Sequence, residues 1–307
     1  MRAQIKKRQR NRRIVILSAV VIVAALVVVG AYLLSNLGGP TSNLVGQQVS
    51  SSVYHAIYAA SQSGYGNVNQ TLMKRMEPST GGSYTSGGKP IILYVGADYC
   101  PYCAFQRWPL VMALMRFGNF SSLDYMLSSP TDVYANSPTF TFYGSKYTSN
   151  YIIFQGYELQ DRSENTLQTL PSNYSSVFQH FGGAYPFIDF ANQYVVSGSF
   201  YFPDQMTGKN WTQIAQSLSS DTVVSNQIVS SANAITAAIC KVTSNAPSSV
   251  CGNPSVSGLT TLLTAYHPSP GVSTGTATQL AAQATGNRSQ YLVTSWGADY
   301  FLSRRLD

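Results

Sequence analysis

The stretch from residue 90 to residue 116 constrains the fold more than any other part of the chain. Residues 90–95 (PIILYV) form an apolar run typical of a short buried strand, and residues 96–99 follow as a tight loop. The motif Cys100-Pro101-Tyr102-Cys103 comes next, and residues 104–116 then carry apolar side chains at helical spacing. A C-x-x-C motif between a strand and a helix is typical of redox sites. We therefore predict an α/β domain with this motif at the start of a helix.

The positions of the two motif cysteines predict different roles. The free N–H groups and the positive dipole end of a helix stabilise a thiolate in the first turn. Cys100, at the helix start, is therefore the predicted nucleophile, and Cys103 is predicted to resolve a mixed disulfide. The alternatives are a purely structural bridge or half of a metal site. A zinc site would need Cys240 and Cys251 as further ligands, and their ten-residue gap is unlike zinc spacing, so we expect no metal.

The four cysteines of the chain allow three disulfide pairings. We expect the most local one, which joins Cys100 to Cys103 and Cys240 to Cys251. The second bridge would close a loop of about 12 residues and contribute ~2–4 kcal/mol to stability. It is predicted to be structural rather than catalytic.

The N-terminal part of the chain predicts a membrane anchor. Residues 1–13 carry seven basic side chains and no acidic one, and residues 14–34 are uncharged and predominantly apolar. At about 1.5 Å per residue this run spans the ~30 Å hydrocarbon core of a bilayer. The charge asymmetry places the N-terminus in the cytoplasm and the large domain outside the cell membrane. A cleaved signal peptide is the alternative, although the apolar run is longer than usual and no small-x-small cleavage site follows it.

The net charge of +7 is explained by this tail and does not indicate a nucleic-acid partner. With its seven basic residues set aside, 12 of the 19 basic residues face 12 acidic ones. An exposed basic surface of the kind that binds phosphate backbones is therefore not expected.

The remaining chain divides into a linker, a domain and a tail. Residues 35–48 are rich in Gly, Ser and Asn and are predicted to be a linker, residues 49–254 the folded domain, and residues 255–307 a peripheral segment. An exported domain would agree with five glycosylation sequons, which lie at Asn69, Asn119, Asn173, Asn210 and Asn287.

Two β-hairpins are predicted in the domain. The first joins residues 139–143 to residues 151–157 through the polar segment 144–150. The second follows Tyr185-Pro186 and joins residues 187–190 to residues 194–196. The stretch between the motif helix and the first hairpin shows no clear periodicity, and residues 223–240 are typical of a helix.

A strand, a C-x-x-C helix, an X-Pro hairpin and a final helix together resemble the thioredoxin fold, here with insertions. The chain is also similar to an archaeal family of membrane-anchored thioredoxin-like proteins, domain of unknown function 929. That resemblance covers roughly residues 50–252. It is carried by Ala97-Asp98-Tyr99-Cys100-Pro101-Tyr102-Cys103, Arg107-Trp108, Arg116-Phe117-Gly118, Tyr185-Pro186-Phe187-Ile188-Asp189-Phe190 and Ala237-Ala238-Ile239-Cys240-Lys241.

The resemblance implies two further site residues, and positions next to the motif suggest others. Pro186 would be cis and lie beside the cysteine pair, and Tyr185 would face a bound substrate chain, whereas a trans turn proline is the alternative. Asp98 and Tyr99 flank the motif and are expected to tune proton transfer or to line the docking groove, unless they are only polar loop residues. Arg107, one turn after Cys103, is expected to be a solvated helix residue rather than a partner of the thiolate.

These observations predict a membrane-tethered thiol–disulfide oxidoreductase that works outside the cytoplasm, on cysteines of exported proteins. No cofactor is expected, and a membrane redox partner is possible. The alternative is a non-catalytic cell-surface binding or assembly protein, in which the motif disulfide only braces the scaffold. A solvent-reachable Cys100 would favour the enzyme. Since the motif adds one polar aromatic group and no charge, we expect a potential between ~−270 and ~−120 mV, as in a disulfide donor or isomerase.

Overall fold

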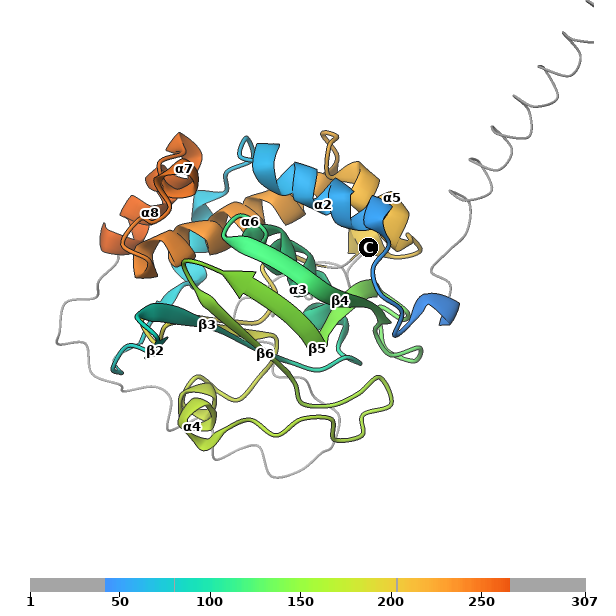
Figure 1. Ribbon diagram of the computed structural model, residues 1–307. Helices are drawn as coiled ribbons and strands as arrows, with labels where there is room; N and C mark the ends of the chain where they lie inside the picture. The colour runs from blue at the N-terminus through green and yellow to red at the C-terminus, as the bar shows by residue number, and fades with distance from the viewer. Residues whose placement is uncertain (1–41, 80, 203, 266–307) are drawn as a thin grey trace, which may run out of the picture. The chain divides into compact units, whose positions relative to one another are not determined.

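The computed structural model describes residues 42–79, 81–202 and 204–265 (Figure 1). The basic tail at residues 1–13, the anchor predicted over residues 14–34 and the sequon at Asn287 lie outside these ranges. The described region is a mixed α/β structure.

The larger sheet of the described region is built around one central strand. Its members are β1 (Glu77–Pro78), β2 (Thr85–Ser86), β3 (Lys89–Gly96), β6 (Ile153–Glu158), β7 (Phe187–Phe190) and β8 (Tyr194–Ser197). Strand β3 pairs parallel with β6 and antiparallel with β7, which in turn pairs antiparallel with β8. The hairpin predicted after Pro186 is therefore confirmed. The apolar run at residues 90–95 forms the middle of β3, where every side chain is buried because both faces of the sheet are covered.

The hairpin predicted from residues 139–143 and 151–157 is wrong. Strand β5 (Pro138–Ser149) continues through most of the expected turn and pairs antiparallel with β4 (Gly118–Leu127) in a separate sheet. Strand β6 pairs with β3 instead. The second half of β5 is half exposed and polar, so its composition is that of a turn although its backbone is extended.

Helices cover both faces of the larger sheet. Alternate residues of β3 point in opposite directions: Ile92 and Tyr94 join the main core with the helices of one face, whereas Leu93 and Val95 pack with a single helix on the other face. The first group consists of α2 (Ser51–Ser63), α3 (Pro101–Leu114), α5 (Trp211–Ser217), α6 (Val223–Val242), α7 (Ser248–Cys251) and α8 (Pro254–Ala265). The single helix is α4 (Ser172–His180), seen at the bottom of Figure 1. Short 3-10 turns complete the fold: η1 (Ser42–Leu44), η2 (Gln70–Arg75) and η3 (Asp204–Met206).

Within the described residues, α6 is the one helix long and apolar enough to cross a membrane by length and composition. Most of its apolar window, 78%, is buried inside the domain. Helix α6 packs against α3 and α8, so its apolar character is explained by its place in the core.

The C-terminal helices extend the core beyond the expected boundary at residue 254. Helix α8 buries Val256, Leu259 and Leu263 in the main cluster. A disulfide joins Cys240 near the end of α6 to Cys251 of α7, with a Cα–Cα distance of 5.5 Å. The described start of the segment 255–307 is therefore part of the domain.

The described end of the predicted linker is also attached to the domain. Gly46 N–H donates to the Tyr125 carbonyl at 2.8 Å, and Tyr125 N–H donates to the Gln47 carbonyl at 2.9 Å. Gln48 forms a β-bridge with Asp124. Residues 46–48 therefore add to the edge of β4 rather than serving as a free spacer.

Candidate redox site

The cysteine motif lies where the sequence predicts it, at the N-terminus of α3. Cys100 is the N-cap residue, and Pro101 fills the first helical position, where no N–H donor is required. The Cys103 N–H donates to Cys100 Sγ at 3.3 Å. The sulfur of Cys100 thus takes the place that a Ser or Asp oxygen occupies in an ordinary helix cap.

Both motif cysteines are free thiols and both are buried. Cys100 is 6% exposed and Cys103 is fully buried. They form a small cluster with Ala97, against which Tyr99, Tyr102 and Tyr185 pack. The solvent-reachable nucleophile expected of an enzyme is therefore covered by tyrosine rings in this structure.

The pKa values of the two thiols move in opposite directions. Burial acts to raise the pKa of Cys100, but hydrogen bonds from the Cys103 side chain and N–H, with the charge of Arg107, outweigh burial and lower it. Burial, followed by the interaction with Cys100, holds the pKa of Cys103 well above its ordinary value. Cys100 is therefore the thiol that ionises first, which is the order a nucleophile and a resolving cysteine need.

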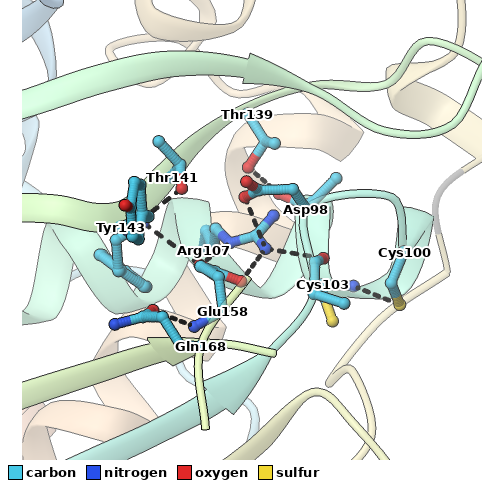
Figure 2. Close-up of polar contacts among 12 residues, drawn as sticks. Asp98, Cys100, Cys103, Arg107, Thr139, Thr141, Tyr143, Glu158 and Gln168 are labelled. Carbon is cyan, nitrogen blue, oxygen red and sulfur yellow. Dashed lines mark hydrogen bonds and ion pairs between the residues drawn. The ribbon is translucent and has the colours of Figure 1, made fainter. Parts of the chain in front are cut away.

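Arg107 is fully buried, so the expectation of a solvated side chain is wrong. Its Nε donates to Glu158 Oε1 at 3.0 Å and its Nη2 donates to Glu158 Oε2, which makes a bidentate ion pair (Figure 2). The same Nη2 donates to the Ala97 carbonyl at 2.8 Å, in the loop that precedes the motif. A permanent positive charge therefore lies beneath the cysteine pair and is tied to the loop that carries it.

Glu158 holds this arginine from the end of β6. It is fully buried and its Oε1 also accepts from the Phe142 N–H at 3.2 Å. Burial raises the pKa of Glu158, whereas the charge of Arg107 opposes that rise. Sequence reasoning missed Glu158 because it lies 51 residues from Arg107. The available signal was the only charged residue of a strand, at its end, where a buried charge needs a partner.

Asp98 completes the charged group from the loop before the motif. It is 2% exposed, and its Oδ1 lies 3.6 Å from Arg107 Nη2 (Figure 2). Burial, with a smaller contribution from Glu158, raises the pKa of Asp98 to about 7. Asp98 also lines a cavity of about 300 Å³ together with Thr141, Asp161 and other residues. A carboxyl with this pKa can hold or release a proton near neutral pH.

Tyr99 and Tyr185 meet over the motif from two loops. The Tyr185–Pro186 peptide bond is cis, as expected. The hydroxyls of Tyr99 and Tyr185 are 2.9 Å apart, and Tyr185 Oη donates to Gln160 Oε1 at 2.8 Å. Pro186 itself is buried. The structure therefore brings Tyr99 and Tyr185 together beside the cysteine cluster, while Asp98 turns inward to Arg107.

Comparison of the sequence with protein families places the chain in a known group. The family model for domain of unknown function (DUF929) matches residues 79–176 and 157–241, which is more than half of the chain. The chain belongs to the DUF929 family. It has no significant match among curated proteins and none among solved structures.

The part of the chain that matches the DUF929 family contains the whole site described above. Cys100, Cys103, Arg107, Glu158 and Tyr185 all lie within the matched residues. The family description names no activity, fold or source, so the redox chemistry and the archaeal origin remain predictions.

The remaining candidate residues lie away from this site. Asn69, Asn119 and Asn173 are exposed, whereas Asn210 is half buried and caps α5 by accepting from the Gln213 N–H. In the described part of this DUF929 chain, no group of three or more His, Cys, Asp or Glu side chains is placed to hold a metal ion.

Proposed function

We propose that the chain is a thiol–disulfide oxidoreductase with Cys100 as nucleophile and Cys103 as resolving thiol. One observation carries the proposal: Cys100 caps α3 and accepts the Cys103 N–H, next to a buried arginine. A structural disulfide has no need for a charged group beneath it, because burying an arginine and its carboxylate partner is costly.

We also infer a thioredoxin-like fold, and the strand arrangement supports this inference. The strands β8-β7-β3-β6 lie in that order, with β6 parallel and β7 antiparallel to β3. Helices α3 and α6 pack on one face and α4 on the other. This order and these layers resemble the thioredoxin core, in which case β4 and β5 form an insertion between the motif helix and the next strand of the sheet.

In the proposed reaction, a substrate thiolate attacks Cys100 Sγ of the oxidised pair. The Cys100–Cys103 bond breaks, and Cys103 leaves with its electron pair and takes up a proton. The second substrate thiolate then attacks the substrate sulfur of the mixed disulfide, and Cys100 leaves as a thiolate. Two electrons pass from the substrate dithiol to the cysteine pair, and a disulfide on a membrane redox partner returns the pair to the oxidised form.

The charged group beneath the motif supports each of these steps. Arg107 lowers the pKa of Cys100 and so favours its departure as a thiolate. Glu158 fixes the guanidinium in place from a neighbouring strand. Asp98, which titrates near pH 7, can exchange a proton with solvent in the adjoining cavity.

The proposed site of action is outside the cytoplasm, with the chain tethered through residues 14–34. The basic tail before that run, the sequons on exposed Asn69, Asn119 and Asn173, and the Cys240–Cys251 disulfide support this placement. Cysteine-containing exported proteins are then the expected substrates.

Trapping of the mixed disulfide tests the proposed function. The Cys103→Ser variant of the full chain is incubated with an unfolded polypeptide that contains a disulfide. We expect a stable mixed disulfide on Cys100, detected by non-reducing electrophoresis and peptide mass spectrometry, and none with Cys100→Ser. If neither variant forms an adduct, the oxidoreductase assignment is wrong.

A second candidate function, a non-catalytic surface scaffold, is favoured by the burial of Cys100 at 6% exposure. In that case the motif cysteines serve only packing. Their reactivity in the folded protein separates the two functions, because a scaffold predicts thiols that react only after unfolding.

A further inference from the structure

The exposure of Cys100 sets a requirement on any reaction at this site. Its side chain is almost fully covered, and the covering groups are Tyr99, Tyr102 and Tyr185. In thiol–disulfide exchange the attacking sulfur must approach the attacked sulfur in line with the disulfide bond that breaks. At least one of these rings must therefore move before a substrate sulfur can reach Cys100.

Two of the three rings are connected by hydrogen bonds whose direction can be assigned. The single hydroxyl proton of Tyr185 goes to Gln160 Oε1, so Tyr99 must be the donor in the contact with Tyr185. The amide orientation of Gln160 is set because its Nε2 donates to the Glu164 carbonyl at 2.8 Å. The Gln160 carbonyl in turn accepts from the Asp98 N–H at 2.9 Å, which anchors this residue to the loop before the motif.

The two tyrosines also come from different loops. Tyr99 immediately precedes Cys100, whereas Tyr185 belongs to the loop before β7. Their rings meet edge to face with centroids 6.2 Å apart. The pair therefore closes the space between the two loops, and the hydrogen bond from Tyr185 to Gln160 fixes it in the closed position.

We propose that Tyr99 and Tyr185 form a gate over Cys100, held shut by Gln160, that selects extended polypeptides over small soluble thiols as substrates. Opening the gate breaks the Tyr99–Tyr185–Gln160 hydrogen bonds and uncovers apolar ring surface. A polypeptide with an apolar side chain beside its cysteine covers that surface again, whereas a small thiol such as glutathione does not. The substrate class rests on the proposed function, but the gate itself does not.

Alkylation of Cys100 tests the gate without requiring any catalytic turnover. The reduced full chain is treated with iodoacetamide, and modification of Cys100 is followed by peptide mass spectrometry. Tyr185→Phe removes both hydrogen bonds while keeping the ring, so we expect its Cys100 to react about tenfold faster than in the unmodified chain. Gln160→Met, which removes the acceptor and leaves both tyrosines, is expected to have a similar effect.

The matched control is Tyr134→Phe. Tyr134 packs edge to face against Tyr102, and its replacement changes no hydroxyl of the gate. Its alkylation rate should equal that of the unmodified chain. If Tyr185→Phe and Gln160→Met react no faster than Tyr134→Phe, the gate is wrong, whether or not the mixed disulfide is trapped.

The alkylation rate of Cys103 distinguishes opening of the gate from a general loosening of the fold. In a Cys100→Ser background, Cys103 is measured with and without Tyr185→Phe. The gate predicts no change at this fully buried thiol, and an equal acceleration at Cys103 would contradict it.

The substrate class is tested with two probes. The oxidised full chain is reduced either by glutathione or by a short synthetic peptide with one cysteine between leucine and phenylalanine. We expect the peptide to react faster per thiolate and Tyr185→Phe to remove most of that preference. Equal rates with both probes in the unmodified chain would overturn the substrate class while leaving the alkylation result intact.

Discussion

The two cysteine pairs of this chain are both buried, yet they lie at opposite ends of their helices. Cys100 caps the N-terminus of α3, whereas Cys240 lies in the last turn of α6. The positive dipole end of a helix stabilises a thiolate, and the negative end opposes one. Burial by itself therefore does not distinguish the pair proposed to react from the pair that forms the Cys240–Cys251 disulfide.

The surroundings of the two pairs differ in charge. Arg107, Glu158 and Asp98 lie beneath the motif, whereas Cys240 and Cys251 belong to the main apolar cluster. The first pair consists of free thiols and the second is a disulfide. In this comparison a buried charge, which is costly to maintain, lies beside the pair to which we assign the proposed chemistry and not beside the disulfide.

The largest expected effect comes from removing the charge beneath the motif. Arg107→Met leaves Glu158 buried without its partner, so we expect a loss of about 3–5 kcal/mol in unfolding free energy, measured by urea denaturation. The pKa of Cys100 should also rise, because Arg107 lowers it. The thiolate absorbance in the ultraviolet measures that rise.

Two further variants separate charge from packing. Arg107→Met combined with Glu158→Gln should recover stability without recovering the low Cys100 pKa. Arg116→Met removes another buried arginine, one that donates to the Ser61 and Gly64 carbonyls instead of a carboxylate. It should cost stability and leave the Cys100 pKa unchanged. A shift in that pKa as large as the shift in Arg107→Met would contradict the role given to Arg107.

A smaller effect is expected from the second cysteine pair. Replacing Cys240 and Cys251 with Ala removes the disulfide and should lower the unfolding free energy by ~2–4 kcal/mol, measured by chemical denaturation. Exchange at Cys100 should be unaffected. A loss of exchange in this double variant would remove the distinction between the two pairs.

The smallest effect, when expressed per pH unit, concerns two buried carboxyls, one beneath the motif and one elsewhere. Burial raises the pKa of both Asp98 and Asp189 from 3.8 to about 7. Between pH 3.8 and about 7 the folded protein keeps these two carboxyls protonated, whereas the unfolded chain releases the protons. The contribution of the two carboxyls to the unfolding free energy is therefore greatest below pH 3.8. It falls as the pH rises to about 7, by up to about 1.4 kcal/mol per pH unit for each carboxyl.

Denaturation at several pH values checks this slope in single variants. Asp98→Asn and Asp189→Asn should each remove the part of this pH dependence that comes from the replaced carboxyl. Only Asp98→Asn should also change the pH profile of Cys100 alkylation, since Asp189 lies on β7 away from the charged group. The raised pKa values of Asp98 and Asp189 would be contradicted if the unfolding free energy of the unmodified chain rose between pH 3.8 and about 7 and that of these variants did not.

The sequence predicts those parts of the structure that depend on neighbouring residues. The strand, loop and helix around Cys100 follow from local apolar spacing, and the hairpin after Pro186 follows from alternation and turn residues. Strand β4 and its pairing with β5 were not predictable in this way, because β5 is half polar and pairs with a strand that shows no clear periodicity.

The charged group was missed for a related reason. Arg107 and Glu158 are 51 residues apart, and a lone arginine on a helix is most often solvated. Their pairing becomes apparent only when β6 lies parallel to β3, because Glu158 is then opposite Gly96, just before the motif. The sequence predicts that Asp98 tunes proton transfer or lines the docking groove, but it does not predict the contact with Arg107, because that contact depends on the burial of both residues.

The reduction potential of the Cys100–Cys103 pair tests the central claim most directly. The full chain is equilibrated with mixtures of reduced and oxidised glutathione, and the fraction oxidised is measured by mass spectrometry after acid quenching; the Cys240–Cys251 bridge is followed in the same samples. Because this is an equilibrium measurement, the rate at which the proposed gate opens does not affect the potential once exchange is complete. We expect a potential between ~−270 and ~−120 mV for the motif pair, with Cys240–Cys251 remaining oxidised throughout. A potential near or below ~−270 mV would make the protein a reductase, and a motif pair that exchanges neither with glutathione nor with the leucine–cysteine–phenylalanine peptide in the folded chain would contradict the oxidoreductase function altogether.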